Sequence, residues 1–288
     1  MRYSKIIVLI VLLGVAKYSF AQQLDIVVSS IAQINAFYPF DIDNPMDRKE
    51  VTQFQNFVTL KEIADTGTLL KLLGHPNAVV ACYAAVGLID KGYPELVRIF
   101  CKVLDDNRGF LSISGDMGSL GEQIATEFYF RYRNNVKKEF IKTDRVLLEL
   151  DSSILFYPYL DSQQSLFYIV LQEREFPNSF IPRIRFLAFE ENRINAAMYL
   201  HKWYKEKYKQ EIEKAFITWL TKPQSVDDSL NGVNPEIIST VLEENTLDVK
   251  KTVVSYLNRH SVPIDNNIFL LLEKYGIYEQ PLGNWKIR

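Results

Sequence analysis

The chain has 288 residues, of which 48% are apolar and 24% are charged, a balance that favours a folded protein over intrinsic disorder. Lys and Arg number 33 against 35 Asp and Glu, so the sequence carries no excess of basic charge for binding nucleic acid. With only 12 Gly and 11 Pro, it also has little room for low-complexity linkers.

The first segment, residues 1–21, has the pattern of a secretory signal peptide. Two basic residues precede an apolar run from Ile6 to Ala16, and small residues suited to cleavage follow. A membrane-spanning helix needs about 20 apolar residues, and Lys17 interrupts the run before that length is reached. We therefore expect cleavage between Ala21 and Gln22 and a periplasmic or secreted mature chain without a transmembrane anchor. An anchor retained at the N-terminus is the alternative.

After the signal segment, helical periodicity dominates the sequence. Leu24, Val27, Val28, Ile31 and Ile34 recur at the three- and four-residue spacing of one helix face. Similar patterns predict helices over residues 24–34, 47–65, 68–74, 78–92, 95–104, 122–140, 143–150, 163–176, 186–208, 212–220 and 268–275. Residues 154–160 and 166–171 are rich in β-formers, so a small hairpin is the alternative to helix there. The sequence as a whole predicts an all-α fold.

The window from residue 68 to residue 107 is the most informative part of the sequence. A short apolar helix stops at Gly74, Pro76 starts a second helix, and Gly92 ends it. The residues that carry a repeat pattern are Leu69, Leu70, Leu72, Leu73, His75, Pro76, Asn77, Val80, Ala84, Leu88 and Gly92. With these residues the window resembles a HEAT repeat, in the short variety with a period of roughly 30 residues.

Weaker echoes of this pattern begin at Glu190-Glu191-Asn192 and at Glu243-Glu244-Asn245. A two-helix unit of this kind cannot bury its apolar faces alone, so such units stack on one another. The resemblance therefore implies an irregular HEAT-like α–α superhelix, a solenoid, over residues 22–275. Residues 276–288 are expected to form an irregular tail.

Cys82 and Cys101 are the only cysteines, and each lies at a similar distance from the turn near Gly92. Antiparallel helices would place them at about the same height. In an exported protein, a disulfide between them is one interpretation. The other is a pair of buried thiols that act as small hydrophobes. Neither interpretation makes them catalytic, because no CxxC motif and no neighbouring His accompanies them.

Four glycines fall between Gly109 and Gly121, ahead of a predicted helix. Backbone N–H groups at such a junction can cradle an anion, and a binding loop there would present Asp116, Ser119 and Glu122. The segment lacks the Lys-Ser/Thr ending of a phosphate loop and does not match the Gly-x-Ser-x-Gly elbow. We therefore expect a flexible loop between two repeats.

The segment from Tyr199 onward is the most distinctive candidate surface, because aromatic residues and lysines alternate along it. The candidate surface residues are Tyr199, Lys202, Trp203, Lys205 and Tyr208. Aromatic area and lysine charge suit a peptide, a glycan or a lipid headgroup. The alternative is an ordinary amphipathic helix in which Tyr199 and Trp203, four residues apart, pack inward.

The three histidines, His75, His201 and His260, lie far apart in the sequence, and none belongs to a spaced metal-binding pair. We expect His75 to serve the turn between two helices, and His260 to follow Arg259 at a helix end, where a cation suits the helix dipole. The sequence predicts no metal site and no cofactor.

The function that best fits an exported helical-repeat protein is binding to another protein or to an extended peptide. Such a protein would be an adaptor, an inhibitor or an immunity-type protein that masks a toxic effector, and not an enzyme. One alternative is a carbohydrate- or ligand-binding module that uses Trp203 and Tyr208. Another is an envelope hydrolase that uses acids of residues 109–122, for which the sequence holds no recognisable motif.

Overall fold

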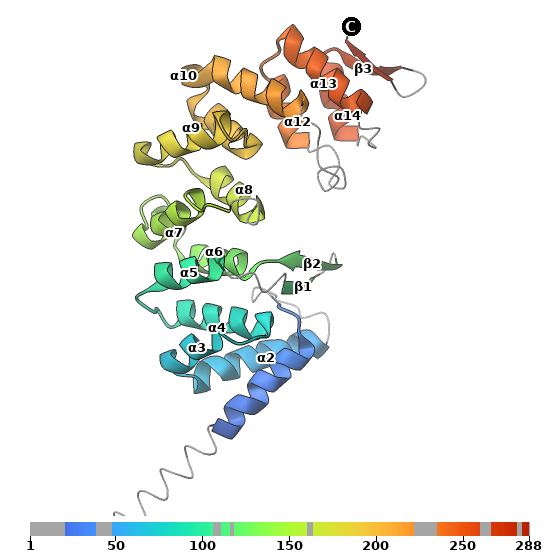
Figure 1. Cartoon of the computed structure of the whole chain (residues 1–288). Coiled ribbons are helices and arrows are strands. Elements are labelled where there is room, and N and C mark those ends of the chain that lie inside the picture. Colours follow the sequence, from blue (N-terminus) through green and yellow to red (C-terminus); the bar gives the residue numbers. More distant parts are fainter. Residues whose placement is uncertain are drawn as a thin grey trace, which may run out of the picture. The chain divides into compact units, whose positions relative to one another are not determined.

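The computed structural model describes residues 21–38, 48–105, 111–115, 118–159, 164–221, 235–259, 266–280 and 284–287 (Figure 1). The predicted signal peptide lies outside these residues, apart from Ala21. The described chain is helical except for two short β-hairpins, which confirms the predicted all-α class. Where the sequence predicts one helical domain, the structure divides into two compact units, with the boundary between Leu166 and Phe167.

The first unit contains most of the elements that precede this boundary. In chain order these are a helix over residues 21–34, α2 (Arg48–Ile63), α3 (Thr66–Leu72), α4 (Ala78–Asp90), α5 (Leu96–Leu104), β1 (Leu111–Gly115), β2 (Gly118–Glu122), α6 (Ile124–Asn135), a 3₁₀ turn (Lys138–Phe140) and α7 (Arg145–Leu155). Three of these helices begin at a side chain that accepts a hydrogen bond from a backbone N–H three residues later. The capping residues are Asp65, Asn77 and Asp144.

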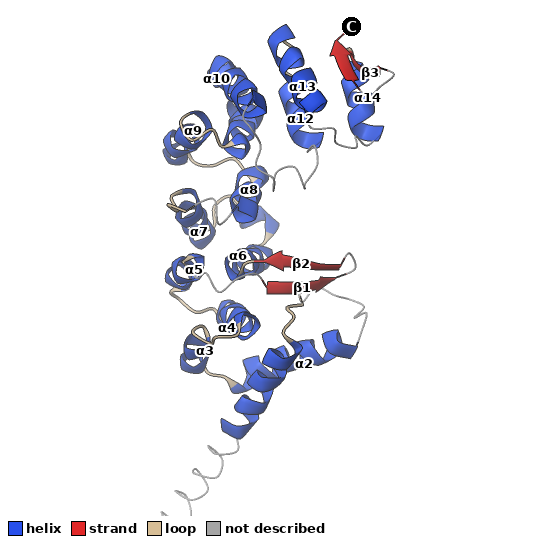
Figure 2. Cartoon of the chain, turned by 45° about the vertical axis from the view of Figure 1, so that its right-hand side comes forward, coloured by secondary structure: helices blue, strands red, loops and turns tan. Residues whose placement is uncertain are grey.

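Within the first unit, the helices from α3 to α7 form two layers. α3, α5 and α7 lie in one layer, and α4 and α6 lie in the other (Figure 2). α4 contacts α3, α5 and α6, and it is buried from Val79 to Ile89. Gly87 permits the close approach of α3, because a Cβ atom at that position would lie 3.3 Å from Leu69 Cδ1. α4 is therefore the centre of this unit's core.

Asp90, at the C-terminal end of α4, ties three helices together. Its carboxylate accepts hydrogen bonds from Arg131 Nε and Nη2 of α6, both at 2.9 Å, and from Lys61 Nζ of α2 at 2.7 Å. Burial by itself raises the pKa of Asp90, but the hydrogen bonds from Arg131 and Lys61 outweigh burial and hold the pKa below its ordinary value of 3.8. The carboxylate therefore stays ionised in the folded protein at neutral pH.

The glycine-rich segment is not the flexible loop that the sequence predicts. β1 and β2 form an antiparallel hairpin, with Ile113 opposite Leu120 and Gly115 opposite Gly118. The strands flank residues 116–117, which lie outside the described chain. Apolar residues alternate with serine in β1, which suits a strand, but the glycines obscure this period of two in the sequence.

The second unit contains the remaining elements. In chain order these are α8 (Gln164–Glu173), within which the unit boundary falls, a 3₁₀ turn (Asn178–Phe180), α9 (Ile181–Phe189), α10 (Ile194–Thr221), α12 (Pro235–Leu242), α13 (Leu247–Arg259), α14 (Asn266–Lys274), β3 (Ile277–Gln280) and β4 (Asn284–Ile287). Residues 166–171 belong to α8, so helix, and not the alternative hairpin, is confirmed there.

α10 folds back on itself. Tyr204 and Tyr208 have non-helical backbone angles, with φ of −138° and −126°. The ring centroids of His201 and Phe216 are 5.8 Å apart, whereas a straight helix would separate residues at this spacing by about 22 Å. α10 therefore consists of two helical segments that pack against each other, and the reversal at Tyr204 and Tyr208 begins before the break predicted between residues 208 and 212.

Two turns in the second unit share one sequence and one geometry. Asn192 and Asn245, which end the two Glu-Glu-Asn triplets, both adopt left-handed backbone conformations, with φ of 53° and 50°. Asn tolerates this conformation better than most residues that carry a side chain. One triplet separates α9 from α10, and the other separates α12 from α13. The predicted continuous helix over residues 186–208 is therefore wrong, because the chain turns at Asn192.

The C-terminal residues form a hairpin and not the irregular tail predicted for residues 276–288. β3 and β4 are antiparallel, with Ile277 opposite Ile287. Trp285 is buried, and Asn258 of α13 binds its backbone twice. Asn258 Nδ2 donates to Trp285 O at 3.2 Å, and Asn258 Oδ1 accepts from Trp285 N–H at 2.7 Å. The amide side chain thus pairs with β4 as a neighbouring strand would.

Replacing Asp90 with Asn should lower the free energy of unfolding of the first unit by about 2 kcal/mol at neutral pH, because two basic side chains lose their partner. The carboxylate's contribution is complete above pH 3.8 and is lost as the pH falls through the lowered folded value, so variant and wild type should converge in acid. Urea unfolding at several pH values measures the difference. The control Glu95→Gln removes an exposed pair with Arg98 and should change the free energy by less than about 0.5 kcal/mol. Equal losses in both variants would contradict the role of Asp90.

Replacing Asn258 with Ala should remove both hydrogen bonds to Trp285 and lower the free energy of unfolding of the second unit by about 2 kcal/mol. The Trp285 amide should also exchange with solvent deuterons faster than in the wild type. Hydrogen exchange followed by NMR measures this rate. Lys251→Ala, an exposed position on the same helix, is the control and should leave the rate unchanged. An unchanged rate in the Asn258 variant would show that other contacts hold β4.

Candidate functional site

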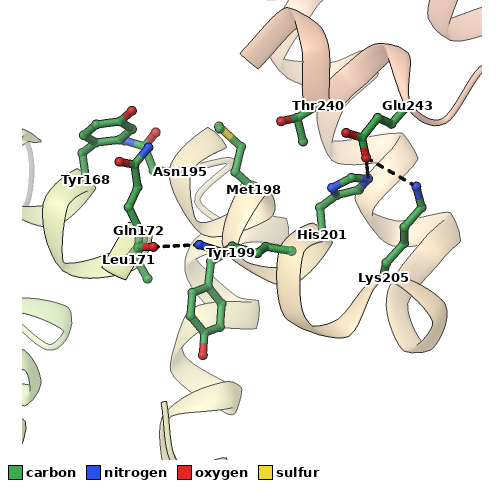
Figure 3. Close-up of a pocket in the computed structure, with 11 residues that line it drawn as sticks. Tyr168, Leu171, Gln172, Asn195, Met198, Tyr199, His201, Lys205, Thr240 and Glu243 are labelled. Atoms are coloured by element: carbon green, nitrogen blue, oxygen red, sulfur yellow. Dashed lines mark hydrogen bonds and ion pairs between the residues drawn. The ribbon is translucent and has the colours of Figure 1, made fainter. Parts of the chain in front are cut away.

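A cavity of about 530 Å³ lies within the second unit, between α8, α10 and the C-terminal end of α12 (Figure 3). Its size is within the range of small-molecule and peptide side-chain sites in proteins. The lining residues are Tyr168, Leu171, Gln172, Asn195, Met198, Tyr199, His201, Lys202, Lys205, Thr240 and Glu243.

One face of α10 supplies much of this lining. Asn195, Met198, Lys202 and Lys205 follow the three- and four-residue steps of a single helix face. The face begins just after the Asn192 turn and ends where α10 folds back. The fold of α10 therefore fixes the length of the cavity wall.

Two hydrogen bonds hold α10 against the end of α8 and the segment that follows it. Lys202 Nζ donates to the backbone oxygen of Gln172 at 2.9 Å. The Tyr199 hydroxyl oxygen accepts a hydrogen bond from the backbone N–H of Phe176 at 2.7 Å, and burial raises the pKa of Tyr199. The two walls of the cavity are therefore joined by specific polar contacts and not by apolar packing alone.

The lining changes in character from one end to the other. Figure 3 shows the neutral polar groups of Tyr168, Gln172 and Asn195 at one end. Met198 lies between this end and the opposite one, where charged side chains gather. A ligand that fits such a cavity carries both an apolar part and a polar or charged part.

His201, Lys205, Glu243 and Glu244 meet at the charged end. His201 Nε2 is 3.1 Å from Glu244 Oε1 and 3.7 Å from Glu243 Oε2. Lys205 Nζ is 3.4 Å from Glu244 Oε1 and 3.9 Å from Glu243 Oε2. The Glu244 side chain is fully buried, and within the described chain neither of its oxygens has a hydrogen-bond partner. Glu243 lines the cavity with its side chain half exposed.

Burial lowers the pKa of His201 below its ordinary value of 6.5, and the charge of Lys205 lowers it further, although the two carboxylates act in the opposite direction. The imidazole is therefore mainly neutral at neutral pH. Lys205 is then the cation that faces both Glu243 and Glu244 at this end of the cavity. A neutral imidazole beside carboxylates can accept or donate a hydrogen bond to a bound group.

The residues of the predicted aromatic and basic surface do not form one surface in the structure. Tyr199 and Tyr208 are buried, with 2% and 6% of their surface exposed, so they are core residues and do not form an open aromatic stripe. Lys202 and Lys205 line the cavity. Trp203 is not among the lining residues, and the Lys202 ammonium lies 5.2 Å from its ring centroid. The inward packing of Tyr199 agrees with the amphipathic-helix interpretation.

Cys82 and Cys101 are both free thiols in this structure, so the interpretation as a disulfide pair does not describe it. Cys82 is fully buried in α4, and burial raises the pKa of its thiol. Cys101 is exposed on α5, with its Sγ 3.5 Å from the Ser153 Oγ of α7. Only Cys82 matches the interpretation of a buried thiol.

The other predicted positions do not belong to this cavity. Ser119 lies opposite Ser114 in the hairpin of the first unit, Glu122 lies in the same strand as Ser119, and Asp116 lies outside the described residues. His75 Nδ1 accepts a hydrogen bond from the backbone N–H of Asn77 at 3.1 Å, which confirms its place in the turn. His260 lies outside the described residues.

Among the described side chains, no group of three or more His, Cys, Asp or Glu is arranged to hold a metal ion. In the same part of the chain, no helix has both the length and the apolar character needed to cross a bilayer. Comparison with protein-family models, with curated proteins and with solved structures gives no match for this chain.

Sequence reasoning missed His201, Glu243 and Glu244 as members of one site. The signal that was present is the repeated Glu-Glu-Asn triplet, which marks the turn after α12. The triplet does not say which helix faces this turn, and the contact between α10 and α12 supplies that information.

Replacing Lys205 with Met should raise the pKa of His201, because the nearby positive charge is removed while burial remains. Titration of the imidazole nitrogen resonances by NMR measures this pKa. Lys209→Met removes an exposed charge of α10 outside the cavity lining and should leave the pKa unchanged. A fall in the His201 pKa in the Lys205 variant would contradict the described arrangement of charges.

Proposed function

We propose that this protein is an exported helical-repeat protein that binds another protein through an extended peptide, as an adaptor, an inhibitor or an immunity-type protein and not as an enzyme. In this proposal, the cavity of the second unit accepts side chains of the peptide. The observation that carries the proposal is the mixed lining of that cavity, where apolar and charged side chains of three helices face one space.

The packing of consecutive helices supports the repeat part of the proposal. In the first unit α4 contacts α6 and α5 contacts α7, and each of these pairs consists of neighbours in one layer. In the second unit the Glu-Glu-Asn turn occurs twice with the same backbone conformation. Stacking of this kind is what a HEAT-like superhelix requires, and the resemblance of residues 68–107 to a HEAT repeat agrees with it.

The chemistry of the lining supports a peptide as the ligand. The side-chain amides of Gln172 and Asn195 each offer a donor and an acceptor, as a peptide group does. Leu171 and Met198 offer apolar surface to a side chain. Charged groups beyond Met198 offer a partner to a polar end group, so one peptide could use all three kinds of contact.

A small-ligand-binding module is the second candidate function, because a cavity of about 530 Å³ also fits a compact metabolite or a sugar unit. The two candidate functions differ in whether the ligand also contacts the protein surface around the cavity. A peptide of a partner protein extends beyond the cavity, whereas a small ligand is held by the lining alone.

Selection from a random-peptide phage library on the purified full-length protein tests the proposal. We expect peptides with a shared motif to be enriched, and their binding to fall at least about tenfold in Met198→Arg, which places charge and bulk in the cavity. Leu270→Arg alters an exposed apolar side chain of α14 outside the cavity lining and is the matched control. Peptides that bind the two variants equally, or a selection that yields no motif, would overturn the proposal. Circular dichroism of both variants shows whether they remain folded.

A further inference from the structure

The charged end of the cavity holds more carboxylate than cation. Glu243 and Glu244 face one ammonium group, that of Lys205, whose Nζ lies 3.9 Å from Glu243 Oε2 and 3.4 Å from Glu244 Oε1. His201 approaches both carboxylates through Nε2. Only 7% of the His201 side chain is exposed, and Nε2 has no hydrogen-bond partner in the described chain. The fully buried Glu244 carboxylate is likewise without a hydrogen bond. Buried polar groups without hydrogen bonds are rare in folded proteins, and a bound cationic group is one partner that would satisfy these carboxylates.

We propose that the charged end of the cavity binds a lysine or arginine side chain of the partner peptide, with Glu243 as the residue that contacts its cationic group. This inference rests on the proposed function, because it names the residue type that the peptide inserts. The cation would add the positive charge that the two carboxylates lack. Ion pairs in such partly desolvated sites contribute more than pairs in open solvent.

The shape of the lining agrees with a long basic side chain. Met198 lies between the neutral end and Glu243, and Leu171 lies beside Gln172 at the neutral end, so both offer apolar surface to an aliphatic stem. Lysine and arginine bury such stems while their charged ends remain polar. Glu243 is half exposed, so its oxygens remain accessible to a group that enters from solvent.

An acidic side chain fits the same cavity less well. Lys205 already faces two carboxylates, and Lys202 donates a hydrogen bond to the backbone of Gln172 and lies over the Trp203 ring. An anion at the charged end would meet Glu243 and would have to compete with it for Lys205. Like charges at this distance repel each other in a partly buried site.

Binding of three matched probes to the purified full-length protein tests the proposal. The probes are the N-acetyl, N-methylamide derivatives of lysine, norleucine and glutamate, and NMR shift titration gives each dissociation constant. We expect the lysine probe to bind at least about tenfold more tightly than the norleucine probe, which keeps an aliphatic chain but has no charge. The glutamate probe should bind more weakly than the lysine probe.

Two variants of Glu243 and one control separate charge from shape. Glu243→Gln should weaken binding of the lysine probe about tenfold, and Glu243→Lys should transfer the preference to the glutamate probe. Glu206→Gln, an exposed acid of α10 outside the cavity lining, should change nothing. Because Glu243 is half exposed, both variants should fold, and circular dichroism checks this.

Several results would overturn the inference. These are equal binding of the lysine and norleucine probes, tighter binding of the glutamate probe to the wild type, and no lysine binding up to the solubility limit of the probe. Phage peptides that depend on Met198 but lack basic residues would leave the proposed function standing and remove this inference. Lysine binding without any Met198-dependent peptide would mean that the cavity binds a small cationic ligand and not a protein.

Discussion

The fold-back of α10 at Tyr204 and Tyr208 is the constraint on which the second unit depends. It brings Phe216 against His201 and ends the cavity wall at Lys205. Without it, the part of α10 after Lys205 would continue away from α9 as one rod. The buried ring of Tyr208 packs against Phe189 of α9. Aromatic contacts therefore stabilise the change of direction, which in many helices is caused by a Gly or a Pro.

The charge cluster at the end of this wall differs from the ion pairs of the first unit. Asp90 has three hydrogen bonds from two cations, and its burial is thereby compensated. Glu244 is more deeply buried, yet its nearest polar neighbours, the His201 imidazole and the Lys205 ammonium, lie close to it without forming hydrogen bonds. The hydrogen bonds to Asp90 compensate the burial of its charge, whereas the buried Glu244 carboxylate lacks such bonds, which is costly unless a partner supplies them.

Much of the fold could be predicted from the sequence, because local signals dominate in helices. Val80, Ala84 and Leu88 recur at four-residue steps, and Asn77 caps the helix that contains them. The hairpins could not be predicted, since β1 carries glycine and β4 is held by Asn258, which lies on a distant helix. The site could not be predicted for the same reason: a step of 42 residues separates His201 from Glu243, and only tertiary packing joins them.

Because Cys82 is buried and Cys101 is exposed, the reaction of the two thiols with an alkylating reagent can be used to follow opening of the core of the first unit. Thiol reagents act on the thiolate of an accessible cysteine, so Cys101 is open to alkylation in the native protein. Cys82 is fully enclosed in α4, and burial raises its pKa, so it is protected by both access and ionisation. The number of alkylated thiols therefore distinguishes an intact α4 from an opened one, and the rate at which the second thiol reacts reports how often that core opens.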